Sequence, residues 1–149
     1  MARSCECMVL VDTSIVWHIA FNTVVAPVAR GIVSVVRSIC DIVYTRFNEE
    51  DVLLDEKLDK QQKEKLLSAY ASIATRIEVK IDRERVLGRF ARWVRKLGPR
   101  DVLIAVSAQR LGAFLLTADW GQTRLVIESL GRRVIYVPLH ELRKVCRSG

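Results

Sequence analysis

Short runs of apolar residues alternate with amphipathic stretches along the chain. Four runs have the composition of strands: residues 7–11 (CMVLV), 77–81 (IEVKI), 113–117 (AFLLT) and 133–137 (RVIYV). Most of them are continuously apolar, which is typical of parallel strands buried on both faces. Residues 77–81 instead alternate between apolar and polar side chains, which indicates a strand near an edge of the sheet.

Helical patterns occupy most of the chain between these runs. Apolar side chains at positions 32, 35, 36, 39, 40, 43 and 47 have the spacing of one helix face and predict a helix over residues 32–47. Further helices are predicted from Thr13 or Ser14 up to a break at Pro27, and over residues 60–75, 83–98, 100–112, 121–131 and, briefly, after 138. The acidic residues 48–62 are interpreted as a solvated connection.

Alternating strands and helices predict an α/β fold. We expect a three-layer α/β/α sandwich around a central, mainly parallel sheet of four or five strands. The 149 residues suit a single domain, with a core over about residues 8–138 and a short C-terminal tail. The uncharged segment 13–29 is short for a membrane span and contains His18 and Asn22, so we interpret it as a buried helix.

The net charge of +7 attracts polyanions such as RNA or DNA without sequence preference. An arginine-rich solvated surface is the competing interpretation. Within the helix at 83–98, the candidate phosphate contacts are Arg83, Arg85, Arg89, Arg92 and Lys96. For each of them, a solvated helix face explains the pattern equally well.

The four cysteines do not form a zinc-ribbon pattern. Cys5 and Cys7 are separated by one residue, no second pair lies nearby, and the two histidines are far apart. Four thiols favour a reducing, cytoplasmic location. The Arg-, Val-, Ile- and Leu-rich composition also suits a heat-adapted organism, in which intracellular disulfides occur.

Several acids are expected at one edge of the sheet. Asp12 and Asp119 each follow a predicted strand directly, and ligand sites of open α/β sheets lie beyond the carboxyl ends of the strands. Asp101 begins the helix that leads into the strand before Asp119, and Asp41 lies among apolar residues of the second helix. Each acid also has a plain structural interpretation as a turn, cap or surface residue.

Clustered carboxylates repel one another, and a hard divalent cation relieves that repulsion. Mg²⁺ or Mn²⁺ held by a few aspartates activates water and stabilises the leaving oxygen of a phosphodiester. This chemistry needs no Ser–His pair, and no such pair is recognisable in the sequence.

With these residues identified, the sequence resembles the PIN-domain family of metal-dependent ribonucleases. The stretch VLVDTSIVW is similar to the family's first strand and D-T-S/N motif, and RDVLIAVSAQRLGAFLLTADW to its D-x-x-I-A-x-x-A segment with the following strand and T-x-D. The resemblance covers about residues 8–138 and is nearest to VapC-like toxins of toxin–antitoxin pairs.

The resemblance implies a role for each matching residue. Asp12, Asp101 and Asp119 correspond to metal-binding acids, and Thr13 or Ser14 and Thr117 to supporting hydroxyl positions. Asp41 occupies the place of the family's second-helix Glu, with Glu49 or Glu50 as the alternative if the helix register differs. These four aspartates are therefore the predicted catalytic residues.

The implied function is a Mg²⁺- or Mn²⁺-dependent endoribonuclease. Toxin-like members are typically homodimers controlled by an antitoxin protein. Three alternatives remain open: a non-catalytic RNA- or protein-binding module of the same fold, an RNA-processing nuclease outside toxin–antitoxin systems, and a nuclease for structured DNA.

Overall fold

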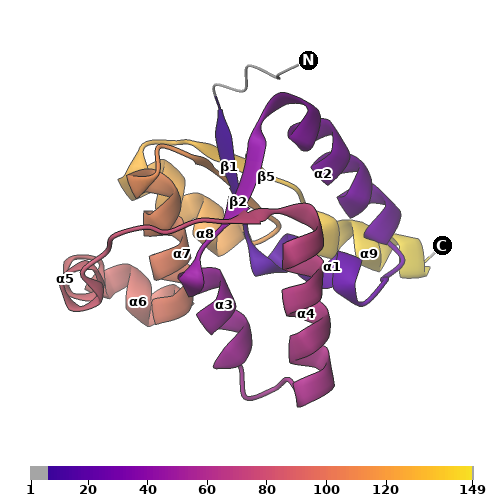
Figure 1. Cartoon of the computed structure of the whole chain (residues 1–149), viewed down its shortest axis with the longest axis horizontal. Helices are drawn as coiled ribbons and strands as arrows, with labels where there is room; N and C mark the ends of the chain where they lie inside the picture. The colour runs from indigo at the N-terminus through magenta and orange to yellow at the C-terminus, as the bar shows by residue number, and fades with distance from the viewer. Residues whose placement is uncertain (1–6, 149) are drawn as a thin grey trace.

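Five strands form one sheet in the computed structural model, which describes residues 7–148, and every pair of neighbouring strands is parallel (Figure 1). The strands are β1 (Met8–Val11), β2 (Asp41–Tyr44), β3 (Thr75–Arg76), β4 (Phe114–Thr117) and β5 (Val134–Tyr136), in the order β3-β2-β1-β4-β5. The predicted α/β class and parallel sheet are confirmed.

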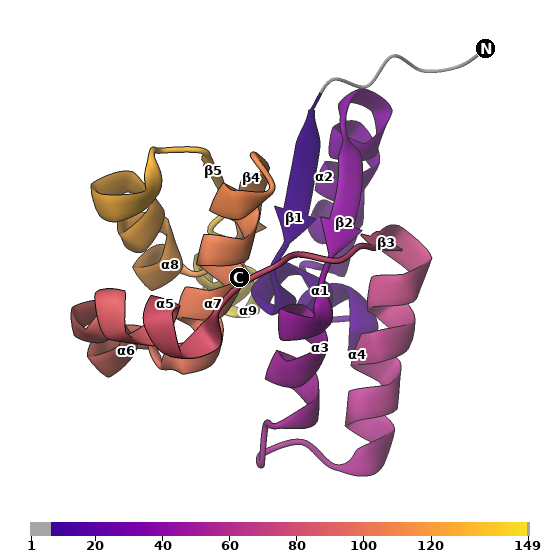
Figure 2. The same cartoon turned by 60° about the vertical axis from the view of Figure 1, so that its left-hand side comes forward.

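Helices cover both faces of this sheet (Figure 2). They are α1 (Thr13–Ala20), α2 (Ala26–Ile39), α3 (Arg46–Leu53), α4 (Lys60–Ile73), α5 (Arg83–Arg89), α6 (Ala91–Leu97), α7 (Pro99–Arg110), α8 (Trp120–Leu125), the π-helical turn η1 (Val126–Leu130) and α9 (Leu139–Ser148). Across residues 7–148, no helix combines the length and the apolar composition that crossing a bilayer requires.

The core has two parts because side chains of each strand point alternately to the two faces. Leu10 of β1 packs with α5, α6, α7 and α8 on one face. Val9 and Val11 of the same strand pack with α1, α2, α4 and α9 on the other face. This division gives the three predicted layers.

The helix predicted over residues 32–47 is wrong in its second half. Helix α2 ends at Ile39, Cys40 is extended, and residues 41–44 form β2 between β1 and β3. Ile42 and Val43 are buried on opposite sides of the sheet, in different halves of the core. β-branched side chains suit such a strand, and their spacing in this short run also matches a helix.

Other element boundaries also differ from the predictions. The predicted connection 48–62 contains most of α3, whose start is fixed by a capping box between Thr45 and Asn48. Residues 77–81 are not in a strand, since β3 comprises only Thr75–Arg76. The helix predicted over 83–98 is divided at Phe90 into α5 and α6.

Cys7 and Cys40 form a disulfide that joins the residue before β1 to the residue before β2. Two of the four cysteines are therefore not thiols, in contrast to the prediction. Cys146 is free and exposed on α9, and Cys5 lies outside the described residues.

Candidate metal centre

Asp12 lies at the carboxyl end of β1, where β1 is paired with β4. Its side chain caps α1 and is 3% exposed. The backbone N–H of Ser14 donates to Asp12 Oδ2 at 3.1 Å, and the Ser14 hydroxyl donates to the same oxygen at 2.6 Å. One oxygen of the carboxylate is therefore held by the turn that follows the strand.

Thr117 approaches the same oxygen from β4. Its Oγ1 lies 3.2 Å from Asp12 Oδ2 and 3.1 Å from the Ser14 hydroxyl. The backbone N–H of Ala118 donates to Ser14 Oγ at 2.8 Å. These contacts connect the ends of two neighbouring strands and orient Asp12. Ser14 and Thr117, which were expected to support the acids, thus both contact the Asp12 carboxylate.

Asp101 and Asp51 complete a cluster with Asp12. One carboxylate oxygen from each of the three residues lies within 4.8 Å of the others. Asp101 is in the first turn of α7, and Asp51 is on α3. Octahedral ligands of Mg²⁺ on opposite sides of the ion are about 4.2 Å apart at the usual bond lengths. Only small side-chain movements separate these oxygens from a shared ion.

The sequence did not point to Asp51, although it offered Glu49 and Glu50 next to it as alternatives. Those two glutamates instead form ion pairs with Arg76 and Arg83. Burial raises the pKa of Asp51, and a hydrogen bond from Thr13 partly offsets that rise. Arg100 Nε lies 3.2 Å from Asp51 Oδ1. Recognising β2 would have revealed it, since α3 then begins at the carboxyl end of a strand.

Asn48 and Tyr70 hold α3 in place beside β1. The Asn48 amide donates to the carbonyl oxygen of Val11 at 3.0 Å and to the Tyr70 hydroxyl at 3.3 Å. The Tyr70 hydroxyl lies 2.7 Å from the Thr13 hydroxyl. Both Asn48 and Tyr70 are fully buried. The distance between Asp51 and Asp12 is therefore set by a buried polar network.

Asp119 lies near this cluster without belonging to the group of three. Its Oδ1 accepts a hydrogen bond from the backbone N–H of Gly121 at 2.8 Å and caps α8. Its charge raises the pKa of both Asp12 and Asp101, so it is close enough to act on them electrostatically.

The structure does not bring Asp41 to the other acids. The predicted position on a helix is wrong, because Asp41 is the first residue of β2, paired with Met8 at the amino end of β1. Asp12 follows the opposite, carboxyl end of the sheet.

Burial raises the pKa of each clustered acid, and repulsion from neighbouring carboxylates adds to the rise. Burial is the main cause for Asp12, whose pKa rises to about 6, and for Asp101, whose pKa rises to about 8 with further contributions from Asp12 and Asp51. Burial also raises the pKa of Asp51. A site of this kind holds protons near neutral pH unless a cation replaces them.

The buried oxygen Oδ1 of Asp12 is one reason to expect a cation at this site. Asp12 Oδ1 is buried and has no hydrogen-bond partner, whereas Oδ2 of the same carboxylate has several. Buried carboxylate oxygens without partners are costly. An all-oxygen donor set of three carboxylates suits a hard ion such as Mg²⁺ or Mn²⁺. The residues present therefore fit a divalent cation.

The predicted basic residues differ in their surroundings. Arg83 forms an ion pair with Glu50, and its guanidinium lies over the Phe47 ring at 5.5 Å. Lys96 lies over the Trp93 ring at 5.2 Å. Arg85, Arg89 and Arg92 are exposed on α5 and α6. The helix face is thus not a uniform row of free cations.

No protein-family model matches the sequence, and no curated protein matches it. The structure is similar to a solved structure described as VapBC2 from Rickettsia felis bound to a DNA fragment from their promoter. The TM-score is 0.61 at 14% sequence identity, over 87% of this chain and 98% of the other. This likeness confirms the predicted PIN-like fold, and at such low identity it shows the fold alone.

Proposed function

We propose that the chain is a Mg²⁺- or Mn²⁺-dependent endoribonuclease that hydrolyses RNA phosphodiester bonds. The observation that carries this proposal is the convergence of the Asp12, Asp51 and Asp101 carboxylates, together with a buried oxygen of Asp12 that has no hydrogen-bond partner. A divalent ion bound there would supply Lewis-acid stabilisation of the phosphate and a more acidic bound water. Asp41, predicted as the fourth acid, is replaced in this proposal by Asp51.

The residues around the acids have separate tasks in this proposal. Ser14 and Thr117 hold Asp12 Oδ2, which leaves Oδ1 without a hydrogen bond and available to a cation. Arg100 keeps Asp51 in place and opposes the rise in the pKa of Asp101. Asp119 contributes negative charge at the rim. A cation held by Asp12, Asp51 and Asp101 would take the place of protons on carboxylates that their surroundings have already oriented.

Trp120 offers a contact for the substrate beside the acids. It follows Asp119, is 54% exposed, and its ring lies 5.2 Å from the Tyr136 ring. Exposed aromatic rings stack on unpaired bases with little sequence preference. This position supports a single-stranded nucleic acid as the substrate.

The test is cleavage of a labelled single-stranded RNA with Mg²⁺ or Mn²⁺, with EDTA and with an Asp12→Asn variant. We expect cleavage only in the parent protein with metal, and calorimetric binding of Mn²⁺ that the variant lacks. Cleavage by Asp12→Asn at the parental rate would contradict the metal centre. Metal binding without cleavage would favour the non-catalytic alternative.

We further propose that the protein is the cytoplasmic toxin of a toxin–antitoxin pair. The fold supports this role, because the similar solved structure is described as a VapBC complex. An antitoxin gene adjacent to this one, whose product abolishes RNA cleavage when the two proteins are mixed, is the expected finding. Cleavage of a ribosomal RNA precursor without any such neighbour would favour RNA processing.

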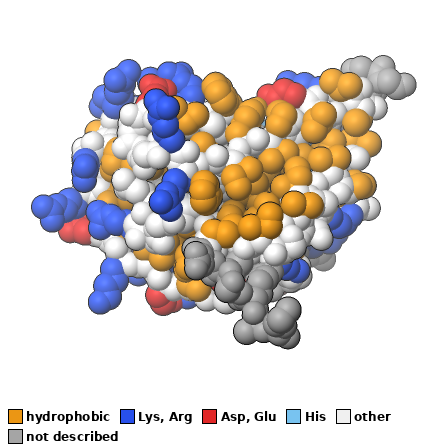
Figure 3. Space-filling view, turned by 90° about the horizontal axis from the view of Figure 1, so that it is seen from above, with side chains coloured by type: hydrophobic (Ala, Val, Ile, Leu, Met, Phe, Trp, Pro, Cys, Tyr) orange, Lys and Arg blue, Asp and Glu red, His pale blue; other side chains and the backbone are white. Residues whose placement is uncertain are grey.

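We also propose that the chain forms a homodimer through the outer face of α2. Val24, Val28 and Val35 are 55%, 43% and 62% exposed and, with Ile32 between them, form one stripe along or just before this helix. Figure 3 shows a wide area of hydrophobic side chains on the side of the molecule where α2 lies. An uncharged face lets two copies, each with a net charge of +7, meet without opposing their charges.

A further inference from the structure

Three arginines outside the acidic cluster surround one small cavity. Arg85 and Arg89 belong to α5, and Arg110 is the last residue of α7. The cavity has a volume of about 150 Å³, and its other lining residues are Val86, Phe90, Val106 and Gln109. The basic face predicted from the sequence includes Arg85 and Arg89 but not Arg110.

Packing of the hydrophobic core brings these arginines together. Arg85 and Arg89 are four positions apart and therefore lie on the same side of α5. Val86 of α5 is 3% exposed and Val106 of α7 is 1% exposed, and both belong to the same part of the core. The backbones that carry the three guanidinium groups are consequently held in place by buried contacts.

The positive charge of this cavity is not compensated by an acid. Among residues 7–148, Arg76, Arg83, Arg100 and Arg124 form ion pairs with carboxylates, whereas Arg85, Arg89 and Arg110 form none. Arg89 instead lies over the Phe90 ring at 5.5 Å. The nearby Asp82 caps α5 by accepting from the backbone of Arg85. Three like charges around one cavity repel one another, and a bound anion relieves that repulsion.

We propose that Arg85, Arg89 and Arg110 bind a backbone phosphate of single-stranded RNA at a distance from the cleaved bond. Guanidinium groups match phosphate oxygens with paired hydrogen bonds. A cavity of this size suits a single phosphate group, and the Gln109 amide supplies an additional donor. This subsite rests on the proposed nuclease function, because it gives the substrate a second point of attachment.

Helix α7 relates the subsite to the acids. Asp101 is in its first turn and Arg110 ends it, nine positions later. This separation corresponds to about 14 Å along the helix axis. Residues 102–108 of α7 are buried, so an RNA strand that contacts both the acidic cluster and the three arginines would pass over the helices that pack on α7 and not along α7 itself.

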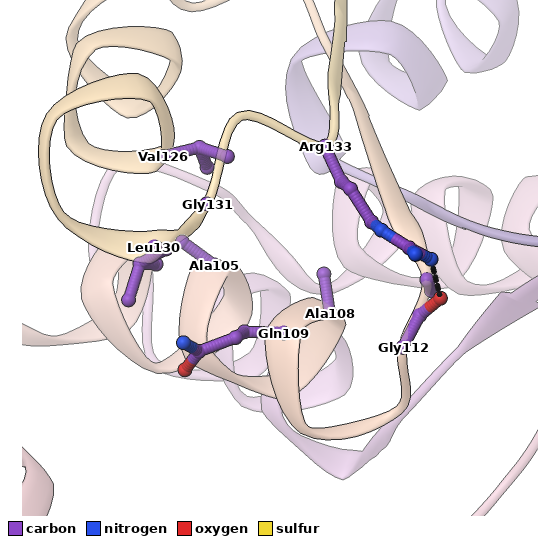
Figure 4. Close-up of a pocket in the computed structure, with 9 residues that line it drawn as sticks. Ala105, Ala108, Gln109, Gly112, Val126, Leu130, Gly131 and Arg133 are labelled. Carbon is purple, nitrogen blue, oxygen red and sulfur yellow. Dashed lines mark hydrogen bonds between the residues drawn. The ribbon is translucent and has the colours of Figure 1, made fainter.

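A neighbouring cavity of about 300 Å³ is less suited to a phosphate. It shares Gln109 with the arginine cavity, and most of its walls are apolar, with Ala105, Val126 and Leu130 among them. Figure 4 shows its single arginine, Arg133, turned to the carbonyl oxygen of Gly112, to which Nη1 donates at 3.0 Å. The Arg133 guanidinium therefore already donates a hydrogen bond within the protein.

The experiment measures binding of a short fluorescein-labelled single-stranded RNA by anisotropy, in EDTA, at several salt concentrations. The site variant combines Arg85→Gln, Arg89→Gln and Arg110→Gln. The matched control combines Arg30→Gln, Lys60→Gln and Lys65→Gln, which removes three exposed charges from α2 and α4. Both variants have the same net charge, so an effect of overall charge appears equally in both.

We expect the site variant to bind RNA at least tenfold more weakly. The logarithm of its affinity should also depend less steeply on the logarithm of the salt concentration, by about 0.7 for each phosphate that the arginines no longer neutralise. The control variant should bind like the parent protein. Equal weakening in both variants, or unchanged binding by the site variant, would overturn the subsite. Tighter binding of duplex DNA than of the RNA by the same arginines would overturn its assignment to RNA.

The outcome for the subsite is separable from that for the nuclease. Mn²⁺ binding to the site variant, measured by calorimetry, should be unchanged, because none of the three arginines contacts the acids. Arginine-dependent RNA binding without metal-dependent cleavage would uphold the subsite and remove the proposed activity. If cleavage depends on Asp12 but RNA binding does not depend on the three arginines, the proposed nuclease activity is upheld and the subsite is overturned.

Discussion

The side-chain amide of Asn48 donates a hydrogen bond to the carbonyl oxygen of Val11 at 3.0 Å, and this bond joins α3 to the end of β1. Val11 immediately precedes Asp12, and Asn48 is three positions before Asp51. The bond thus relates the backbones that carry two of the three clustered acids. Asn48 also completes the capping box of α3 through its side-chain oxygen.

Replacing Asn48 with Ala should therefore affect both stability and metal binding. The change removes the cap contact and leaves the Val11 carbonyl oxygen unpaired in a buried place, which costs about 2–3 kcal/mol of unfolding free energy. We expect Mn²⁺ affinity to fall as well, because α3 is no longer fixed to β1. Urea unfolding and calorimetric titration measure the two effects. Parental Mn²⁺ affinity in a destabilised variant would show that the network serves stability alone.

Asp51→Asn tests the acid that the sequence pattern did not identify. Removing one of three carboxylates should weaken Mn²⁺ binding at least tenfold and abolish RNA cleavage, since the ion loses a charged ligand. Asp41→Asn is the matched comparison, because it makes the same chemical change at the amino end of the sheet. The reverse result, with Asp41 required for Mn²⁺ binding and Asp51 dispensable, would restore the prediction made from the family pattern.

The contrast between these two acids shows what the sequence could and could not predict. Asp12 and Asp101 were predictable because each stands next to a pattern with one clear interpretation: an apolar run that ends at a polar turn, and a helix that begins at Pro99 after Gly98. Asp51 was not, because its position depends on β2, a four-residue strand whose apolar residues continue the helical spacing of α2. A run that short does not distinguish the two periods.

The disulfide and the cavity depend on contacts that local patterns do not reveal. Cys7 and Cys40 come together only because β1 and β2 are neighbours in the sheet. Arg110 joins Arg85 because α5 packs on the last turns of α7. The layers follow from local periodicity, whereas pairs such as these follow from the arrangement of the elements in space.

Without metal, stability should fall as the pH rises from about 6.5 to about 8. The pKa of Asp101 is raised to about 8 in the folded protein, so the folded state binds a proton there that the unfolded state has released. The expected loss is about 2 kcal/mol of unfolding free energy. Below pH 6.5 the lowered pKa of buried His18, about 4, has the opposite effect, which is why the upper window is chosen.

Thermal unfolding in EDTA across this window measures the effect. Asp101→Asn serves as the control, because a side chain that does not titrate should give a flatter dependence on pH. Added Mn²⁺ should reverse the trend, since deprotonation favours metal binding. Stability in EDTA that stays constant or rises from pH 6.5 to 8 in the parent protein would contradict the raised pKa.

Reduction of the disulfide between Cys7 and Cys40 should destabilise the fold. The two residues are 33 positions apart, and the loop-entropy model assigns about 3–4 kcal/mol to a closed loop of this length. The melting temperature should fall by about 10 °C with dithiothreitol or in a Cys7→Ser variant. Cys146→Ser is the control, because this exposed thiol is outside the disulfide. Equal melting temperatures with and without reductant would show that the bond contributes nothing to stability.

The proposed dimer surface predicts a specific loss of self-association. Val35 is 62% exposed on α2, and Val35→Asp places a charge within the apolar stripe. Two copies meeting through a twofold axis then bury two unpaired carboxylates in a desolvated contact, so the protein should become monomeric. Leu54→Asp is the matched control, since Leu54 is similarly exposed, at 55%, but follows α3. Light scattering after size exclusion measures both masses. A parent protein that is already monomeric at micromolar concentration, or a Val35→Asp variant that remains dimeric, rules out this surface as the interface.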